Sequence, residues 1–397
     1  MDFVHHEAMK IFRCVNFKFY EVCCQSYIII VSICLLLSCT VKQSVYTETE
    51  LVAFPAIQQD DQWIKNNIEL YRIVPIETTD DYLLTYIKRV ILYKEKLIIL
   101  DRQSSIFVVN MISGKIEKSI QSIGSGPGES RQIRDIAVDD KRGHILVFND
   151  YEKLLYYSLD GKFLKEEHIG KLFENISYEN DNIIFYNECV GLSCYPHKID
   201  IYNLESKKWK TLGDKRKIDF HIRGRGRIMV KSKNLWFVPV LDYSFHVFTE
   251  DSIKVPYALD IKKTITDELK QMSVSDFSSF NQVVNDRNIF FGIQSVKETE
   301  KYLVFSTNFP GLMMMDKNTL VLHGAMYIED EYLGMQLFNY FPHDGDDDEI
   351  MFIVQPSEWI RKKTYAKDLP EMLKEQIEMT NVDEDSNPIL VFYKVKN

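Results

Sequence analysis

The chain has 397 residues, of which 45% are hydrophobic and 13% aromatic, so it can bury a sizeable core and wholesale disorder is excluded. Its formal net charge of −10 argues against nucleic acid as the main partner, because phosphate binding requires a basic surface. One segment is basic instead, because it contains Arg223, Arg225 and Arg227. As alternate residues of a strand they would share one face, and we interpret them as a solvated edge or hairpin.

The first 39 residues have the features of a bacterial export signal. Basic residues precede an apolar run from Tyr27 to Cys39, which is shorter than the ~20 residues of a membrane span and suits a signal peptide. The run ends in Leu-Leu-Ser-Cys, which resembles the bacterial lipobox, whose cysteine receives a diacylglycerol. We therefore predict a signal peptide with lipobox over residues 1–39, lipid attachment at Cys39 and a linker over residues 40–64. The predicted location is the cell envelope, anchored to the outer membrane, with the membrane face left open.

The remaining cysteines are Cys189 and Cys194, and four residues lie between them. In an oxidising compartment they predict a small-loop disulfide, and the alternative is two free thiols in a strand pair. No metal site is predicted, because no second Cys/His pair stands at ligand spacing.

Short segments rich in β-branched and aromatic residues, separated by polar turns, fill the chain from Ile68 onward and indicate an all-β architecture. A loose repeat of about 45 residues is within the range of four-stranded propeller blades and leaves room for six or seven of them. The repeat is clearest in Leu97–Ile120, Ile145–Ile169 and Ile183–Leu212.

Two segments interrupt the strands with helical spacing of apolar residues, Thr264 to Asp286 and Asp368 to Asn381. We interpret both as insertions between strands that decorate one rim, where recognition loops usually lie.

Three motifs in order resemble the six-bladed β-propeller lipoproteins of Bacteroidota. They are a leading IELYRIVPIETTDDYLLTYIKRVILYKEKLIILD from Ile68, a loop Gly124-Ser125-Gly126-Pro127-Gly128-Glu129, and a closing Asp383-Glu384-Asp385-Ser386-Asn387-Pro388-Ile389-Leu390. The resemblance implies an NHL-like six-bladed β-propeller of four-stranded antiparallel blades over residues 65–397, with short helical insertions. It implies architecture and compartment, and it implies no reaction. The final strand, near Ile389–Val395, is expected to pair with Ile68–Ile76 and close the ring.

The glycine cluster also invites a phosphate-binding interpretation, which its neighbours contradict. A P-loop needs lysine where Glu129 stands, and a dinucleotide fingerprint opens a helix, whereas this segment leads into a strand. We interpret Gly124, Gly126, Pro127 and Gly128 as an inter-blade turn. Glu129 and Arg131 either cap this turn or face the channel as ligand-binding residues, and the sequence leaves both open.

The acidic segment HDGDDDEI after Phe341 invites a calcium site, because hard cations favour clustered carboxylates. The EF-hand template fails, since Glu349 stands where that loop needs glycine. We predict a solvated turn between blades.

No catalytic residue and no cofactor are predicted, because the sequence lacks a Gly-x-Ser-x-Gly elbow and its histidines are scattered singly. The predicted function is a lipid-anchored module that binds a small molecule, a glycan or an envelope protein, with the membrane as partner through the anchor. The alternative is a propeller enzyme, a lyase or hydrolase acting on carbohydrate or peptide. A channel-facing cluster of His, carboxylates and Arg with shifted pKa values would favour the enzyme.

Overall fold

The computed structural model describes residues 49–54, 60–121, 123–187, 198–213, 227–239, 242–249, 252–261, 264–266, 268–269, 272, 275–287, 289–290, 292–308, 311–330, 332–337, 340–362, 371–378 and 382–396. The predicted signal peptide with Cys39, and the predicted disulfide of Cys189 and Cys194, lie outside the described residues.

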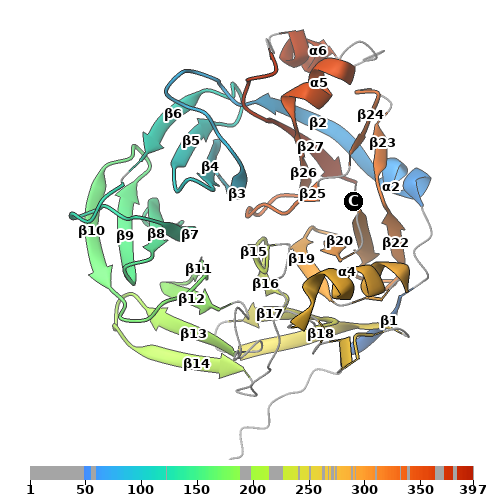
Figure 1. Ribbon diagram of the computed structural model, residues 1–397, viewed down its shortest axis with the longest axis horizontal. Coiled ribbons are helices and arrows are strands. Elements are labelled where there is room, and N and C mark those ends of the chain that lie inside the picture. Colours follow the sequence, from blue (N-terminus) through green and yellow to red (C-terminus); the bar gives the residue numbers. More distant parts are fainter. Residues whose placement is uncertain are drawn as a thin grey trace, which may run out of the picture. The chain divides into compact units, whose positions relative to one another are not determined.

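Six four-stranded antiparallel blades surround a central axis, which confirms the predicted six-bladed β-propeller (Figure 1). From the axis outward, blade 1 contains β25 (Tyr340–Phe341), β26 (Glu349–Val354), β27 (Ile389–Val395) and β2 (Ile68–Pro75). Blade 2 contains β3 (Ile87–Tyr93), β4 (Lys96–Asp101), β5 (Ile106–Asn110) and β6 (Ile116–Ile120). Blade 3 contains β7 (Ile133–Asp139), β8 (His144–Asn149), β9 (Lys153–Ser158) and β10 (Phe163–His168).

Blade 4 contains β11 (Asn175–Glu179), β12 (Asn182–Tyr186), β13 (Lys198–Asn203) and β14 (Trp209–Gly213). Blade 5 contains β15 (Met229–Lys231), β16 (Leu235–Phe237), β17 (Ser244–Thr249) and β18 (Ser252–Asp260). Blade 6 contains β19 (Ile293–Glu298), β20 (Tyr302–Thr307), β21 (Leu312–Asp316) and β22 (Leu322–Ala325). A separate hairpin, β23 (Ile328–Asp330) and β24 (Met335–Leu337), follows blade 6.

The middle strands of the blades are buried on both faces, which explains their continuous apolar sequences. In β4 and β8, for example, every residue after the first is buried, whereas no residue of the outer strand β10 is buried. The buried side chains form six clusters, and each cluster fills the space between two neighbouring blades. The hydrophobic stabilisation is therefore distributed around the ring rather than gathered in one centre.

The ring closes where the two ends of the propeller sequence meet in blade 1. Strand β2 pairs antiparallel with β27, from Ile68 opposite Val395 to Pro75 opposite Ile389, which confirms the predicted closure. The buried side chain of Asn387 strengthens this seam: its Oδ1 accepts from the Leu84 amide at 2.7 Å, and its Nδ2 donates to the carbonyls of Glu77 and Tyr82. The leading and closing motifs of the sequence are thus two halves of one junction.

The segment before β2, which the sequence analysis assigned to a linker, contributes to the packed unit that begins at Thr49. Strand β1 (Glu50–Ala53) adds in parallel to β18 as a fifth strand of blade 5. Helix α2 (Asp61–Asn67) contacts β22, β23 and β2, and it buries Ile64 completely. The chain is therefore fastened to two blades before the ring begins.

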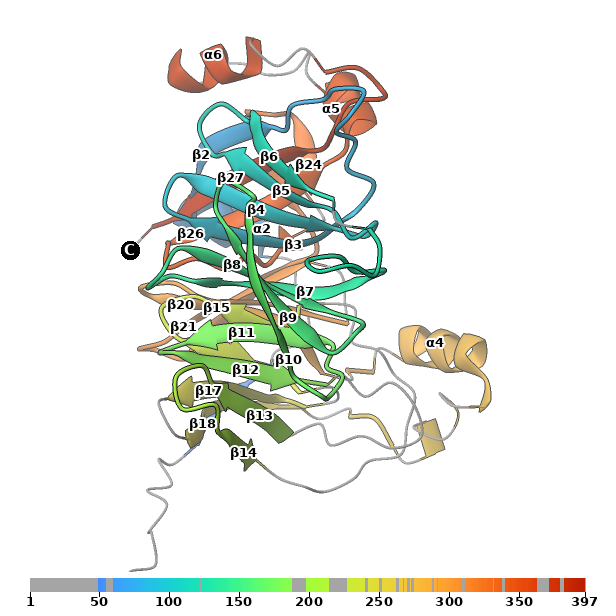
Figure 2. The same cartoon turned by 90° about the vertical axis from the view of Figure 1, so that its left-hand side faces the viewer.

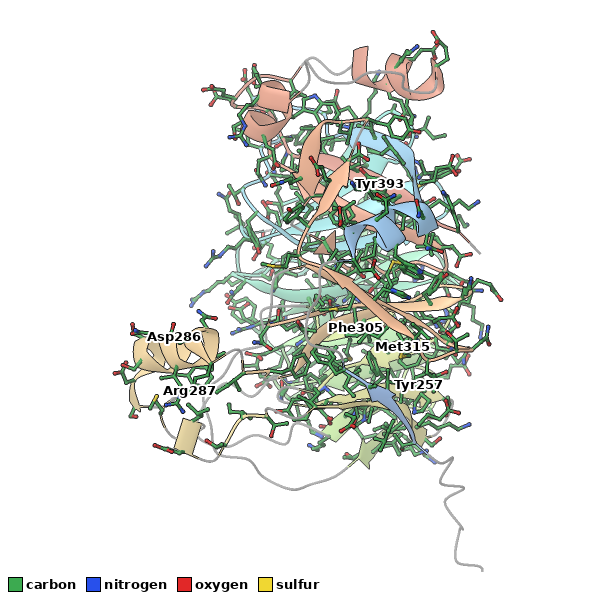
Figure 3. The ribbon with its side chains drawn as sticks, turned by 90° about the vertical axis from the view of Figure 1, so that its right-hand side faces the viewer. Tyr257, Asp286, Arg287, Phe305, Met315 and Tyr393 are labelled. Atoms are coloured by element: carbon green, nitrogen blue, oxygen red, sulfur yellow. The ribbon has the colours of Figure 1, made fainter. Side chains whose placement is uncertain are left out.

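Among the described residues, three further helices lie between strands, at α4 (Phe277–Asp286), α5 (Pro356–Lys362) and α6 (Glu371–Glu378). Asp276 caps α4 by accepting from the Ser279 amide, and Phe280 and Val284 pack against the core between blades 4 and 5. Helix α4 lies beyond one end of the blade strands, as Figure 2 shows and as the labelled Asp286 and Arg287 show in Figure 3. None of the described helices is long and apolar enough to cross a membrane.

Shortening a core side chain at the seam is expected to destabilise the closed ring. Leu390→Ala removes a fully buried side chain from β27 and should lower the free energy of unfolding by about 2–5 kcal/mol. Lys394→Ala, on the same strand but exposed, should change it by less than about 0.5 kcal/mol. Denaturant unfolding of both variants measures this, and equal effects would contradict the assigned seam.

Candidate functional site

The charged side chains at the centre of the ring come from the inner strands. Within each blade the chain runs from the inner strand outward, except that the outer strand of blade 1 is β2 from the other end of the propeller sequence. The six inner strands therefore all run in the same direction along the axis. Arg89 on β3 is only 1% exposed. Its Nη1 donates to Asp135 Oδ2 on β7 at 2.9 Å and to the Ile176 carbonyl on β11 at 2.8 Å, and its Nε donates to Asp344 Oδ2 at 3.1 Å. One guanidinium thus joins blades 1, 2, 3 and 4.

A second arginine completes the neutralisation of Asp135. Arg227, just before β15, donates from Nη1 and Nη2 to the two oxygens of Asp135 at 3.1 and 3.0 Å. Burial alone would raise the pKa of Asp135, but Arg227 and Arg89 outweigh it and hold that pKa below its ordinary value. The expectation that Arg227 lies on a solvated edge is wrong, because its side chain is 8% exposed and pairs with a buried carboxylate. Arg223 and Arg225 lie outside the described residues.

The acidic segment between β25 and β26, residues 342–348, runs into the centre of the ring, and we call it the axial loop. The Asp344 amide donates to the Val90 carbonyl at 3.0 Å and the Asp344 carbonyl accepts from the Leu92 amide at 2.7 Å, which ties the loop to blade 2. The Gly345 amide donates to the Lys231 carbonyl at 2.8 Å, which ties it to blade 5. The predicted solvated turn is therefore wrong: Asp344 is 4% exposed, and burial is possible because Arg89 neutralises it.

A second buried ion cluster holds the far part of the axial loop. Lys297 on β19 donates to the Gly345 carbonyl at 2.9 Å and to Asp347 Oδ2 at 3.3 Å. His343 Nε2 lies 3.1 Å from Asp347 Oδ1. Burial and the Lys297 ammonium lower the pKa of His343, whereas Lys297 and His343 outweigh burial and hold the pKa of Asp347 well below its usual range. At neutral pH this cluster carries an ionised carboxylate, an ammonium and a neutral imidazole.

The same ion pairs engage two of the carboxylates that the acidic segment offered as calcium ligands. Asp344 accepts from Arg89 and Asp347 accepts from Lys297, so the buried oxygens of the loop already have cationic partners. Among the described residues, no three His, Cys, Asp or Glu side chains gather in a way that could hold a metal ion.

A cavity of about 350 Å³ opens beside the axial loop, at the end of the ring where the inner strands finish. We call it the axial pocket. Its walls are residues 91–94 of blade 2, Ala137, Val138 and Asp140 of blade 3, Ser177 and Tyr178 of blade 4, Lys231 and Ser232 of blade 5, and residues 344–346. Helix α4 leads into the beginning of the inner strand β19, whereas the axial pocket lies where the inner strands end. The helix is therefore at the opposite end of the axis. The cavity belongs to the channel mouth away from that helix.

The polar groups of the axial pocket differ in how fully they are satisfied. The Lys231 ammonium forms an ion pair with Glu179, and burial lowers its pKa against the opposing influence of Asp140, Asp344 and Asp346. Asp140 and Asp346 are exposed at the rim. Ser177 is 1% exposed and lines the cavity. The pocket thus combines a neutralised floor with acidic groups at its mouth.

A second cavity, of about 340 Å³, lies on the outer side between α2, β2 and β23. In its wall, the hydroxyl of Tyr393, which is labelled in Figure 3, donates to Asp330 Oδ2 at 2.7 Å and fastens the β23–β24 hairpin to blade 1. Burial raises the pKa of Tyr393, and the Asp330 carboxylate adds to this effect. This pair serves packing.

The glycine cluster lies in the connection from β6 to β7, between blades 2 and 3. Gly128 has a φ of +74°, and a Cβ there would come within 2.8 Å of the Phe163 ring, so the position requires glycine. Glu129 Oε2 accepts from the Gly126 amide at 2.8 Å, which caps the turn, and the Arg131 guanidinium lies 5.9 Å from the Tyr151 ring centroid. Gly124, Gly126, Pro127, Glu129 and Arg131 are not among the residues that line the axial pocket.

Arg89, Asp135, Lys231 and Lys297, four of the charged residues at the ring centre, were not predicted from the sequence. A signal for them was available. Arg89 and Asp135 are buried residues of strands whose other residues are mostly apolar, IKRVILY and IRDIAVD. A charge flanked by buried strand residues must find a partner, so such positions are candidates for an ion-paired interior.

Comparisons with known proteins find a matching family model and solved structures of similar fold. A family model described as "Domain of unknown function (DUF4934)" matches residues 57–394. A protein of Bacteroides fragilis NCTC 9343, described as a candidate exported protein, is 18% identical, with a TM-score of 0.69 over 88% of this chain and 100% of that one. A member of the DUF4221 family from Bacteroides vulgatus ATCC 8482 is 11% identical, with a TM-score of 0.53 over 84% of this chain and 99% of that one. No curated protein matches the sequence.

Removing the Arg89 guanidinium is expected to destabilise the propeller strongly. Arg89→Met leaves Asp135 and Asp344 buried with less compensation and should lower the free energy of unfolding by about 3–5 kcal/mol. Lys165→Met breaks an exposed ion pair with Glu167 and should cost about 1 kcal/mol or less. Denaturant unfolding compares them, and a mild effect of Arg89→Met would contradict the bridging role.

The lowered pKa of His343 predicts a dependence of stability on pH. The unfolded imidazole binds a proton near its ordinary pKa of about 6.5, while the folded one resists protonation until lower pH. Stability is therefore fully present above that value and is lost as the pH falls through it toward the folded pKa. His343→Gln should unfold with a shallower loss of stability between pH 7 and 5 than the wild type, measured by chemical denaturation. An equal slope would show that His343 does not contribute.

Proposed function

Because the chain belongs to the DUF4934 family, whose description names no activity, we propose a function from the site itself: a binding module of the cell envelope that holds a small polar ligand in the axial pocket. The observation that carries the proposal is the pocket's construction. Four blades and the axial loop converge on a cavity of about 350 Å³, a size within the range of small-molecule sites. Its floor rests on ion pairs that are complete without a ligand.

The proposal includes anchoring of the protein to the outer membrane through a lipid at Cys39. Its support is the signal pattern that ends at this cysteine, together with the candidate exported protein of similar fold. A tether would keep the propeller at the membrane surface, where a bound ligand would be captured or presented to an envelope protein.

An enzyme is the second candidate, because a cluster of His, carboxylates and Arg with shifted pKa values does occupy the ring centre. The cluster is buried and its groups bond to one another, as His343 bonds to Asp347 and Asp135 bonds to Arg89 and Arg227. Its pKa shifts also fix each group in one charge state near neutral pH, whereas acid–base catalysis needs groups that exchange protons there. Binding is therefore the function that the geometry favours.

Lys231 is the residue on which the two candidates differ. Its lowered pKa suits a catalytic base or nucleophile on the pocket wall. A lyase or hydrolase acting through it would convert a captured carbohydrate or peptide, and Lys231→Met would abolish turnover. A binding module would return its ligand chemically unchanged.

Replacing the acceptor cysteine is expected to release the protein from membranes. Cys39→Ala removes the thiol that the lipid would modify, so the protein should shift from the membrane pellet to the soluble fraction after cell lysis. Cys34→Ala, in the same apolar run, should remain in the pellet. Membrane retention of Cys39→Ala would contradict lipid anchoring.

Filling the axial pocket is expected to abolish ligand capture. Full-length protein would be incubated with a small-molecule extract of its host, repurified and denatured, and the released compounds identified by mass spectrometry. Ser177→Leu places a larger apolar side chain on the pocket floor and should release none of the compounds that the wild type carries. Ser278→Leu, exposed on α4 at the other end, should behave like the wild type. Identical compounds from the wild type and Ser177→Leu would refute this site, provided that thermal unfolding shows both variants folded.

A further inference from the structure

The charges around the axial pocket do not cancel at its mouth. Arg89 and Arg227 balance Asp135 and Asp344, and Lys231 balances Glu179. With these pairs set aside, the lining retains the carboxylates of Asp140 and Asp346 and the single ammonium of Lys94. Within the described part of the chain, neither the Asp140 nor the Asp346 side chain forms a hydrogen bond or ion pair.

The ammonium of Lys231 cannot serve as a receptor for an anion without losing its own partner. It pairs with Glu179, and Asp140, Asp344 and Asp346 are all close enough to raise its pKa against the effect of burial. An anionic ligand next to Lys231 would therefore face several carboxylates. A cationic ligand would instead meet two rim carboxylates that lack a fixed partner, which is the favourable arrangement.

The rest of the lining suits a ligand whose uncharged part is compact, mostly apolar and able to form one hydrogen bond. Ile91, Leu92 and Val138 provide an apolar wall, and Tyr93 adds an aromatic ring. That ring already accepts a cation, since Lys94 Nζ lies 5.0 Å from its centroid. Ser177 is 1% exposed and lines the floor of the cavity, so its hydroxyl can donate a hydrogen bond to a ligand there or accept one from it.

We propose that the axial pocket binds an organic cation, a primary ammonium or guanidinium on a compact, partly apolar body. Asp140 and Asp346 would face the cationic group, Tyr93 and Val138 would contact the body, and Ser177 would hydrogen-bond to it. This inference rests on the proposed binding function and names the ligand class of the same pocket.

Three probes of nearly the same shape test the charge requirement: benzylamine, benzyl alcohol and benzoate. Each would be titrated into the full-length protein in detergent, with saturation-transfer NMR as the readout and the folded Ser177→Leu variant as the baseline for nonspecific partition. Benzylamine is expected to bind at least tenfold more tightly than the other two, and its binding should weaken as salt is raised because rim charges are screened.

Two carboxylate substitutions locate the effect. Asp140→Asn and Asp346→Asn should each weaken benzylamine binding about two- to fivefold, and together about tenfold, as expected for partly exposed ion pairs at independent positions. Glu384→Gln, which removes an exposed carboxylate from the turn before β27, should leave binding unchanged. Unchanged binding in the double variant would overturn the inference.

The remaining outcomes separate this inference from the proposed function. If benzoate or benzyl alcohol binds as tightly as benzylamine in a manner that Ser177→Leu abolishes, the pocket is a binding site but not a cation site. If none of the three binds, the inference fails, and the mass-spectrometric capture experiment alone decides the proposed function. Cadaverine and an N-acetyl-lysine methylamide distinguish the two sources of an ammonium: preference for the first indicates a free amine, and for the second a lysine side chain of a peptide.

Discussion

The buried guanidinium of Arg89 is the contact on which the centre of this propeller depends. It reaches from blade 2 to carboxylates and a carbonyl on three other blades, so one side chain joins four blades. Hydrophobic clusters hold each blade to its two neighbours, but they act only between adjacent blades. Arg89 and Lys297 act across the axis, and they fix the axial loop that forms one wall of the pocket.

Ions at the centre of a ring are a consequence of its geometry. The inner strands have only one side paired within their own blade, and their free edges meet around the axis, where backbone groups need partners. The guanidinium of Arg89 and the amides of the axial loop supply such partners, as when Arg89 donates to the Ile176 carbonyl and Asp344 pairs with β3. Each buried charge is desolvated at a cost, and the cost is offset because each has an opposite charge and further hydrogen bonds. Because these partners all come from the protein itself, the ion pairs form a floor for the axial pocket that is complete without a ligand.

The fold followed from the sequence because its determinants are local or repetitive. The composition of segments such as KLIILD predicts a strand, and the leading and closing motifs predicted the seam that β2 and β27 form. The site did not follow, because its contacts join distant residues: Arg89 meets Asp135 46 residues away and Asp344 255 residues away. From the neighbouring residues alone, HDGDDDEI is expected to form a solvated turn and Arg227 is expected to be exposed to solvent. Their burial depends on partners from other blades, which no window of the sequence contains.

The axial loop belongs to blade 1, the blade that the two ends of the propeller sequence complete together. Its flanking strands, β25 and β26, stand beside β27 and β2 in one sheet. Strand β2, from the other end of the propeller sequence, completes the sheet that carries this loop. The wall of the pocket that we propose as a ligand site and the seam that closes the ring are therefore parts of one sheet.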